Sequence, residues 1–415
     1  MKRIAFLLLI STLLLAGCGL DPRVITSSTG EAPTPVVETI EAETPTVKPE
    51  TAVPTGTQAP EPTSLPTDEP KSLYNMLAYV GSDGNLHLKD LVSGEDTALT
   101  EDAVQNAAGD EVSYSSLEWS SDGLLLAYQR LTARSIAAGL EYHFSLWVYD
   151  PASGTHTEVL ADVQTAGFAW RPGSHMLTFA YTVQEGYFSE RATVDAARAT
   201  GIWGIDVDAG GAPVEIAPPE GGYTVVAPHW SADGRIVAFD EIFGMEGTGY
   251  FAYYHMETGQ YTRREQQVGG YDLASDGSWL VFDTLTYIAS GMERIWRVNL
   301  DWTGAQRISP HYGEGYAFFP RLSPDGNQVA YLKGMGMPGE TSMDEYEIFV
   351  QPTVETNAPQ SFGRVLTPMT LEWMPDGASL ILTVGAPSDP EIITVSLEDT
   401  RVDKLADGSY PAVRP

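Results

Sequence analysis

The sequence predicts an all-β fold built from repeated small antiparallel sheets, and three observations support that prediction. A short phrase, in which a large apolar residue precedes a tight turn and an apolar stretch, recurs roughly every 40–60 residues, the spacing of propeller blades. Its first residues are Trp119, Trp170, Trp230, Leu273, Leu322 and Trp373. The apolar stretches are short and bounded by Gly, Asp and Pro, as in strands joined by tight hairpins. Helical periodicity is nearly absent outside residues 190–199, so we expect a β-propeller.

The amino terminus has the features of an export signal. Met1-Lys2-Arg3 precedes an apolar run from Ile4 to Ala16, which is too short to span a bilayer as a stable helix. Leu15-Ala16-Gly17-Cys18 resembles the lipobox of bacterial lipoproteins, and this resemblance implies cleavage before Cys18 and acyl chains on that residue. Since Cys18 is the only cysteine, no disulfide is expected. We expect a signal peptide over 1–17 and a lipid anchor at Cys18, the alternative being an ordinary secretory signal that contains one cysteine.

Residues 18–72 are expected to form a disordered tether. The segment is rich in Pro, Thr and Glu and almost free of aromatic residues, so it cannot bury enough apolar surface to offset its ordering entropy. Pro-rich chain tends toward the polyproline conformation, in which some fifty residues reach at most about 150 Å. The tether is either a stalk whose length matters or an inert spacer.

Each repeat is expected to contribute four short strands. Around Trp119 these are expected at 117–119, 124–128, 145–150 and 158–160. In the Asp-Gly turns, glycine accepts positive φ and the aspartate carboxylate accepts turn amides. The turn aspartates are therefore interpreted as structural rather than catalytic: Asp122, Asp233, Asp276, Asp325 and Asp376. The large apolar residue before each turn is expected to pack between blades.

The two ends of the repeat region complement each other. Segments 77–81, 85–90 and 97–100 read as strands two to four of a blade that lacks strand one, whereas 409–415 reads as an isolated strand one. Joining them leaves no unpaired sheet edge. We therefore expect seven blades over residues 73–415, with the first blade shared between the amino- and carboxy-terminal segments.

Two phrases carry a resemblance to a known family. Leu322-Ser-Pro-Asp-Gly-Asn-Gln-Val-Ala-Tyr331, and Asn85-Leu-His-Leu-Lys-Asp90 ahead of Ser93-Gly94, resemble the repeats of TolB-like propellers. The resemblance covers nearly all of the chain after the tether and implies the propeller fold. It does not imply an activity, because similar repeats also cap prolyl-oligopeptidase-type peptidases and sugar-active enzymes. The chain has no Gly-x-Ser-x-Gly elbow, which argues against a fused peptidase.

Long insertions are predicted on one side of the propeller only. The connections between strands one and two, and between three and four, are uniformly tight. The connections between strands two and three are longer, at 129–143, 182–200, 240–249, 283–293 and 333–345. Insertions on one face of a repeat protein mark a binding face, although neutral drift of surface loops is the alternative. Aromatic residues in or near these loops are candidate ligand contacts: Tyr142, Tyr187, Phe188, Phe243, Tyr250, Tyr287, Tyr312 and Tyr316.

A second candidate site is a ring of polar residues, each one position before the apolar residue of the repeat. Its members are Glu118, His229, Asp272, Arg321 and Glu372, and the equivalent residues of the two other blades are Ala169 and Ala412. Strand alternation places them opposite the packed residue, and we expect them near the start of strand one at the mouth of the central channel. They either form a polar ligand site or pair with one another and with the backbone.

The charge balance narrows the class of partner. A net charge of −33 argues against nucleic acid and anionic lipid surfaces, so membrane contact is expected through the lipid anchor alone. The acidity serves either solubility or the recruitment of cations and basic partners. The seven histidines lack the short spacing of metal ligands on one element, so no metal site is predicted.

These observations favour a monomeric, lipid-anchored extracytoplasmic propeller at the cell surface or in the periplasm. It would act as a binding or scaffold protein for a protein, peptide or glycan through the long-loop face. The alternative is a carbohydrate-active hydrolase or lyase using Glu118, Asp272, Glu372 or His229 near the channel. Paired glycosidase carboxylates would have to approach within roughly 5–10 Å and stay free of ion pairs. A third possibility is a divalent cation held in the acidic channel, with no other cofactor expected.

Overall fold

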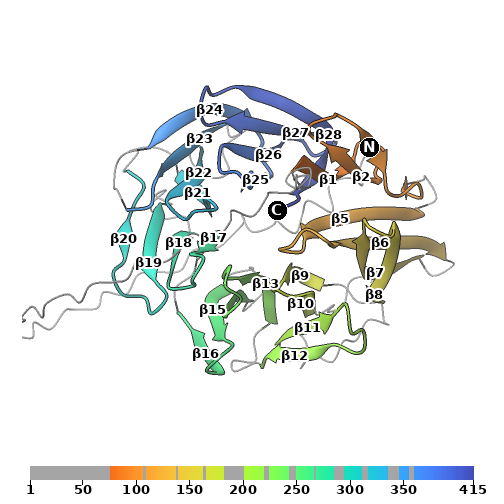
Figure 1. Ribbon diagram of the computed structural model, residues 1–415, viewed down its shortest axis with the longest axis horizontal. Coiled ribbons are helices and arrows are strands. Elements are labelled where there is room, and N and C mark those ends of the chain that lie inside the picture. Colours follow the sequence, from red (N-terminus) through yellow and green to blue (C-terminus); the bar gives the residue numbers. More distant parts are fainter. Residues whose placement is uncertain are drawn as a thin grey trace, which may run out of the picture. The chain divides into compact units, whose positions relative to one another are not determined.

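The computed structural model in Figure 1 describes most of the chain after residue 74. The described ranges are 75–105, 109–136, 139–161, 165–181, 201–218, 224–242, 249–265, 268–284, 294–310, 316–334, 345–354 and 359–415. The predicted signal peptide, Cys18, the tether and the segment 190–199 lie outside them. The elements of these ranges are all strands, and none of the described segments forms a helix that could cross a membrane.

The first and last parts of this region share one antiparallel sheet. It contains β1 (Met76–Gly81), β2 (Leu86–Asp90), β3 (Asp96–Ala98), β25 (Thr370–Trp373), β26 (Ser379–Ala386), β27 (Asp389–Ser396) and β28 (Val402–Val413). A second sheet contains β4 (Val104–Gln105), β5 (Glu111–Trp119), β6 (Leu126–Ile136), β7 (Gly139–Asp150) and β8 (Thr155–Leu160). In both sheets, strands that follow one another in the chain are paired. In the shared sheet β28 also pairs with β1.

Four further sheets have four strands each, paired in chain order. The first is β9 (Thr165–Trp170), β10 (Met176–Tyr181), β11 (Ile202–Asp206) and β12 (Val214–Ala217). The second is β13 (Thr224–Trp230), β14 (Ile236–Ile242), β15 (Gly249–His255) and β16 (Gln260–Arg263). The third is β17 (Tyr271–Leu273), β18 (Trp279–Asp283), β19 (Ile295–Asn299) and β20 (Gln306–Arg307). The last is β21 (Tyr316–Leu322), β22 (Gln328–Gly334), β23 (Glu345–Pro352) and β24 (Gln360–Leu366).

The four-strand sheets are meanders whose first strands lie toward a common centre. In Figure 1, β13, β17, β21 and β25 lie inside, whereas β12, β16, β20 and β24 lie outside. The predicted turns are present, since the glycine after each turn aspartate has φ between 67 and 71°. Each aspartate also accepts an amide two residues on, as in Leu124 N–H to Asp122 at 3.0 Å. The structural interpretation of these aspartates is confirmed.

Strand β28 pairs with two strands of the shared sheet, β27 and β1. Its first half lies along β27, with Val402 opposite Val395, and its second half lies along β1, with Val413 opposite Leu77. Gly408 lies against β1, where an added Cβ would collide with the Val80 carbonyl oxygen. The carboxy-terminal segment therefore lies beside the first described strand, as the complementary ends predicted.

The apolar core is divided into clusters between successive four-strand groups. Phe168 and Trp170 of β9, for example, pack against Ala127 and Leu146 of β6 and β7. A cluster that contains Leu77, Tyr79 and Ile392 joins the first strands to the last ones. The residues before the turns pack as predicted: Trp119, Trp170, Trp230 and Leu273 are buried, while Leu322 and Trp373 are partly buried against their clusters.

The described parts of the predicted long loops differ from the prediction. Segment 129–143 is not a loop, because β6 runs to Ile136 and β7 starts at Gly139, pairing Arg130 with Ser145 and Ala133 with Tyr142. Strand β5 is also longer than predicted and pairs along the same stretch of β6. Within this hairpin the Arg130 guanidinium donates to Asp102 at 2.7 Å. Polar pairs along a hairpin thus concealed the strands.

Candidate functional site

The innermost strands share a bulge that sequence alternation could not show. Two positions before the ring position, several residues have left-handed φ angles: Ser116 (55°), Gly167 (99°), Ala227 (52°), Phe319 (54°) and Tyr410 (53°). Each coincides with a shift of register against the neighbouring strand. A bulge inserts one unpaired residue and re-aims the side chains that follow it. The ring residues are therefore positioned by a recurrent backbone irregularity as well as by the repeat.

The ring residues lie at the end of the innermost strands rather than at the start. Glu118 is the penultimate residue of β5, and His229 and Arg321 hold the same place in β13 and β21. The predicted location near the start of strand one is therefore wrong. The side that carries the Asp-Gly turns, here called the turn face, is where these side chains lie.

A cavity of about 340 Å³ opens among these residues and is here called the channel mouth. Five sheets contribute to its lining: Glu118, Trp119, Ser121, Ala169, Trp170, Pro172, His229, Trp230, Ala232, Asp272, Leu273, Ser275, Leu322, Ser323, Pro324 and Gly326. Of the five predicted ionisable ring residues, Glu118, His229 and Asp272 line it directly. A small ligand group could enter it from the turn face.

Four ring residues form two ion pairs. His229 Nε2 lies 3.0 Å from Asp272 Oδ1, and Arg321 Nε lies 2.9 Å from Glu372 Oε1. Asp272 also accepts the backbone N–H groups of Leu322 and Leu273, at 2.8 and 2.9 Å. The alternative in which ring residues pair with one another and with the backbone therefore describes these four, although two of them still reach the cavity.

Glu118 differs from the other ring residues because it has no ion-pair partner within hydrogen-bonding distance among the described residues. Its Oε1 accepts the Trp170 backbone N–H at 3.1 Å, and its own carbonyl accepts the Trp170 indole N–H at 3.0 Å. Burial raises the pKa of Glu118 to about 7; Glu372 adds to the effect, and the Trp170 N–H and the His229 charge reduce it. This carboxyl group is thus divided between its acid and its anion near neutral pH.

In the His229–Asp272 pair, each group favours the charged form of the other. Burial disfavours the imidazolium, but Asp272 and Glu118 outweigh both burial and Arg321 and raise the pKa of His229. Burial likewise opposes ionisation of Asp272, whose pKa is nevertheless lowered by His229, Arg321 and the Leu322 N–H. The His229 side chain is 45% exposed and that of Asp272 15%. The imidazole ring therefore faces the channel mouth, and the less exposed Asp272 carboxylate contacts its Nε2.

Indole groups fix the backbone of the ring. Trp119 donates to the Ala412 carbonyl at 3.0 Å and Trp373 to the Arg321 carbonyl at 2.9 Å, each across to the preceding sheet. Together with the Trp170 contact, these bonds tie the ring positions of neighbouring sheets. The channel mouth is thus lined by the ends of the innermost strands and by the turns that follow them.

The aromatic candidates are distributed differently from the prediction. Tyr142 and Tyr250 are partly buried residues of β7 and β15, and the Arg263 guanidinium lies 5.5 Å from the centre of the Tyr250 ring. Tyr316 was expected to be an exposed loop residue, but it begins β21, is only 7% exposed and packs against Phe318 and Gly334. The remaining candidates lie outside the described residues: Tyr187, Phe188, Phe243, Tyr287 and Tyr312.

Two acids in the second strands of neighbouring sheets, Asp240 of β14 and Asp283 of β18, were missed by sequence reasoning. Asp283 accepts the backbone N–H groups of Gly270 and Phe319, both at 3.0 Å. Burial, assisted by the charge of Asp283, raises the pKa of Asp240 to about 7. The signal was the repeated dipeptide Phe-Asp at 239–240 and 282–283. Within the described ranges, no three His, Cys, Asp or Glu side chains are grouped so as to bind one metal ion.

Comparisons with known proteins place this fold among β-propellers. No protein-family model and no curated protein matches the chain. Solved structures that resemble it include a prolyl endopeptidase (14% identity, TM-score 0.56, covering 81% of this chain and 50% of that one). They also include the oligogalacturonate lyase of Vibrio parahaemolyticus (13%, 0.54, 80% and 85%) and TolB of Acinetobacter baumannii (13%, 0.45, 83% and 68%). The chain is therefore an all-β protein of the propeller type, with TolB proteins among its structural neighbours.

Proposed function

We propose that this chain is a lipid-anchored, extracytoplasmic seven-bladed propeller that binds a protein, peptide or glycan ligand. The division of β28 between β27 and β1 supports seven blades, since each half then completes a four-strand group. The clusters between successive groups, including the one that joins Leu77 to Ile392, support a closed ring. TolB structures among the neighbours agree with an extracytoplasmic protein.

The anchor is proposed from Cys18 and the preceding Leu-Ala-Gly. Replacing Cys18 by Ser should release the protein from the membrane fraction, because the sulfur to which the lipid would be attached is removed. Fractionation of cells that express the parent or the variant measures this. Retention of the variant after detergent-free washing would show that something other than acyl chains holds the protein.

The observation that carries the binding proposal is the channel mouth. Its cavity combines a carboxyl oxygen of Glu118 that is not used by the backbone with the exposed imidazole of His229. Glu118 can accept a hydrogen bond, or donate one when protonated, and the second ring nitrogen of His229 offers a further polar contact. A few polar groups converging in a concave, preformed site are typical of ligand pockets. No reaction is needed to account for this arrangement.

The long-loop face remains a second proposed contact surface, because its insertions lie mostly outside the described residues. Capture from a bacterial envelope extract can separate the two surfaces. The bait proteins are the parent, the double variant Glu118→Gln/His229→Gln and a variant shortened within 182–200. Glu158→Gln, at an exposed position of β8, is the matched control.

If the ligand enters the channel mouth, the double variant loses a bound species that the parent and the control retain. If the ligand binds the long-loop face, the shortened variant loses it instead. The binding proposal is refuted if all four baits retain the same species, since neither surface would then contribute to its capture.

A carbohydrate-active enzyme is the second candidate, and one observation favours it: a pKa near 7 suits Glu118 to general acid catalysis. Against it, Asp272 and Glu372, the other two carboxylates considered, are both engaged in ion pairs. Incubation with oligogalacturonates, the substrate class named for one structural neighbour, decides between a binding protein and an enzyme. The binding proposal predicts no cleavage products, whereas products that disappear in Glu118→Gln would establish the enzyme.

A further inference from the structure

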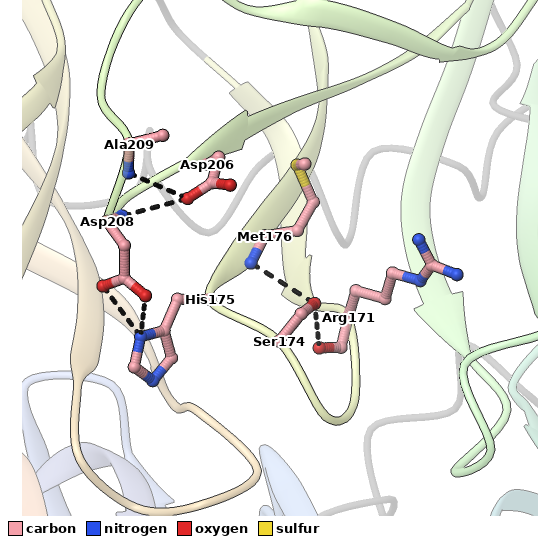
Figure 2. A pocket seen from close by; sticks show the side chains of 7 residues that line it. All are labelled: Arg171, Ser174, His175, Met176, Asp206, Asp208 and Ala209. Atoms are coloured by element: carbon pink, nitrogen blue, oxygen red, sulfur yellow. Dashed lines mark hydrogen bonds and ion pairs between the residues drawn. The ribbon is translucent and has the colours of Figure 1, made fainter.

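One histidine outside the channel mouth lies between two carboxylates that belong to different sheets. His175 precedes β10; its Nδ1 lies 2.8 and 2.9 Å from the two carboxylate oxygens of Asp208, which follows β11 in the same sheet. Its Nε2 lies 2.9 Å from Asp122 Oδ2, in the turn between β5 and β6 of the preceding sheet. Figure 2 shows His175 and Asp208 facing each other on one side of a cavity of about 540 Å³.

The chemistry of imidazole restricts when this arrangement is stable. A neutral imidazole has one N–H donor and one lone pair, whereas the imidazolium donates from both nitrogens. With both nitrogens within hydrogen-bonding distance of carboxylates, the neutral ring would turn a lone pair toward one of the anions. The double contact therefore requires the imidazolium form.

The other charged groups near His175 are already engaged. Asp206 accepts the backbone N–H groups of Asp208 and Ala209, at 3.1 and 3.0 Å (Figure 2). The Arg171 guanidinium donates to the Gly234 carbonyl and lies over the Trp230 ring. Arg414, which packs beside the Asp122 turn, donates to the Gly123 carbonyl and lies over Trp119. Within the described residues, neither arginine forms an ion pair with Asp122 or Asp208, so protonated His175 is their closest cation.

We propose that His175 is a pH-sensitive clip that fastens the β9–β12 sheet to the β5–β8 region at the turn face. The clip closes on the Asp122 turn when the ring is protonated and opens when it loses its proton. Beside it, the Gly173 N–H donates to Ser121 Oγ at 3.0 Å. Ser121 and Pro172 line the channel mouth, so the clip also holds part of the wall of the proposed ligand site. That last consequence alone depends on the proposed function.

The direction of the pH dependence follows from the surroundings of the ring. Burial opposes the imidazolium, but the contacts with Asp208 and Asp122 outweigh it and raise the pKa of His175 above the ordinary 6.5. A raised pKa in the folded state means that the clip contributes all of its stability below the ordinary value. This contribution is lost as the pH rises through the folded value.

The clip is tested by urea unfolding of the full-length chain between about pH 5 and pH 9, the range in which histidine titrates. The parent is compared with His175→Gln and with Asp208→Asn, which removes one charge while leaving the Asp122 turn intact. His143→Gln, at a position with a half-exposed ring, is the matched control. At the acid end of the range, the urea midpoint of the parent should be higher than those of His175→Gln and Asp208→Asn. At the alkaline end, this difference should disappear.

A second measurement does not depend on the stability of any variant. Titration of ring-labelled histidine by NMR in the parent should give His175 a pKa above 6.5, and Asp208→Asn should lower it. The clip is disproved if that value is not above the ordinary one, or if the advantage of the parent is the same at every pH. Ligand capture that is independent of pH would remove only the link to the channel mouth and would leave the clip itself standing.

Discussion

Glu118 and Asp272 occupy the same position in two different sheets, yet the pKa values of their carboxyl groups are shifted in opposite directions. Both accept the backbone N–H of the residue before the turn in the following sheet, Trp170 in one case and Leu322 in the other. Asp272 additionally binds His229 at 3.0 Å, whereas Glu118 has no cation at that distance among the described residues. The pKa of Glu118 rises to about 7, and that of Asp272 falls.

This difference shows that burial alone does not decide the charge of a residue in this ring. Burial raises the pKa of both carboxyl groups, and the local partner determines whether that increase survives. Asp272 is therefore structural, because two backbone N–H groups and an imidazolium depend on it. Among the described residues, one oxygen of Glu118 accepts a hydrogen bond, from the Trp170 N–H, and this oxygen carries no ion pair.

The largest effect is expected from Asp272→Ala. The substitution leaves His229 and the Leu322 and Leu273 N–H groups without their acceptor. Because the His229 side chain is 45% exposed, its ion pair contributes little, and the main loss is that of the two N–H groups, at about 1–3 kcal/mol for each one left unsatisfied. Urea unfolding at neutral pH measures the loss. Glu158→Ala, at an exposed position of β8, should leave the free energy of unfolding nearly unchanged. If Asp272→Ala is as stable as that control, Asp272 does not stabilise the fold and does not differ from Glu118 in this respect.

Glu118→Gln should change the pH dependence of stability. Because burial raises the pKa of Glu118 from 4.5 to about 7, its contribution is full below about pH 4.5 and declines as the pH rises to about 7, by roughly 3 kcal/mol. Glutamine keeps the acceptor for Trp170 and does not ionise, so the variant should gain on the parent over that interval. Unfolding at several pH values checks this, and parallel curves for the two proteins would contradict the raised pKa.

The repeated phrase was enough to predict the architecture, because Asp-Gly turns and large apolar residues act locally. Trp119 packs and Asp122 turns as their positions in the repeat imply. The residue order already places Glu118 at the end of its strand, because it lies just before the turn at 121–123, so the expected location near the start was a misreading of that order. The bulge at Ser116 could not be predicted, because it leaves no pattern in the residue types. The partners of the ring also come from neighbouring sheets, 43 residues apart in the case of His229 and Asp272, and no local pattern encodes such a pairing.

The predicted loops show a second limit of sequence reasoning. Arg130 lies in a β hairpin, and its guanidinium donates to Asp102, 28 residues earlier. Tyr316 was expected to be an exposed loop aromatic, but its ring is buried beside Phe318 and against Gly334. The contacts of Arg130 with Asp102 and of Tyr316 with Gly334 join residues well apart in the sequence, which a local pattern does not show.

The smallest effect is expected from Glu372→Gln, and it sharpens the comparison within the ring. The negative charge of Glu372 helps to raise the pKa of Glu118, so its removal should lower that pKa without changing any hydrogen bond of Glu118. Glutamine keeps an acceptor oxygen for the Arg321 guanidinium, so the substitution removes the charge of Glu372 and not its contact with Arg321. NMR titration of the Glu118 carboxyl carbon in parent and variant measures the change. An unchanged pKa would mean that burial alone maintains it, and the neighbouring charge would then have no part in keeping Glu118 protonated.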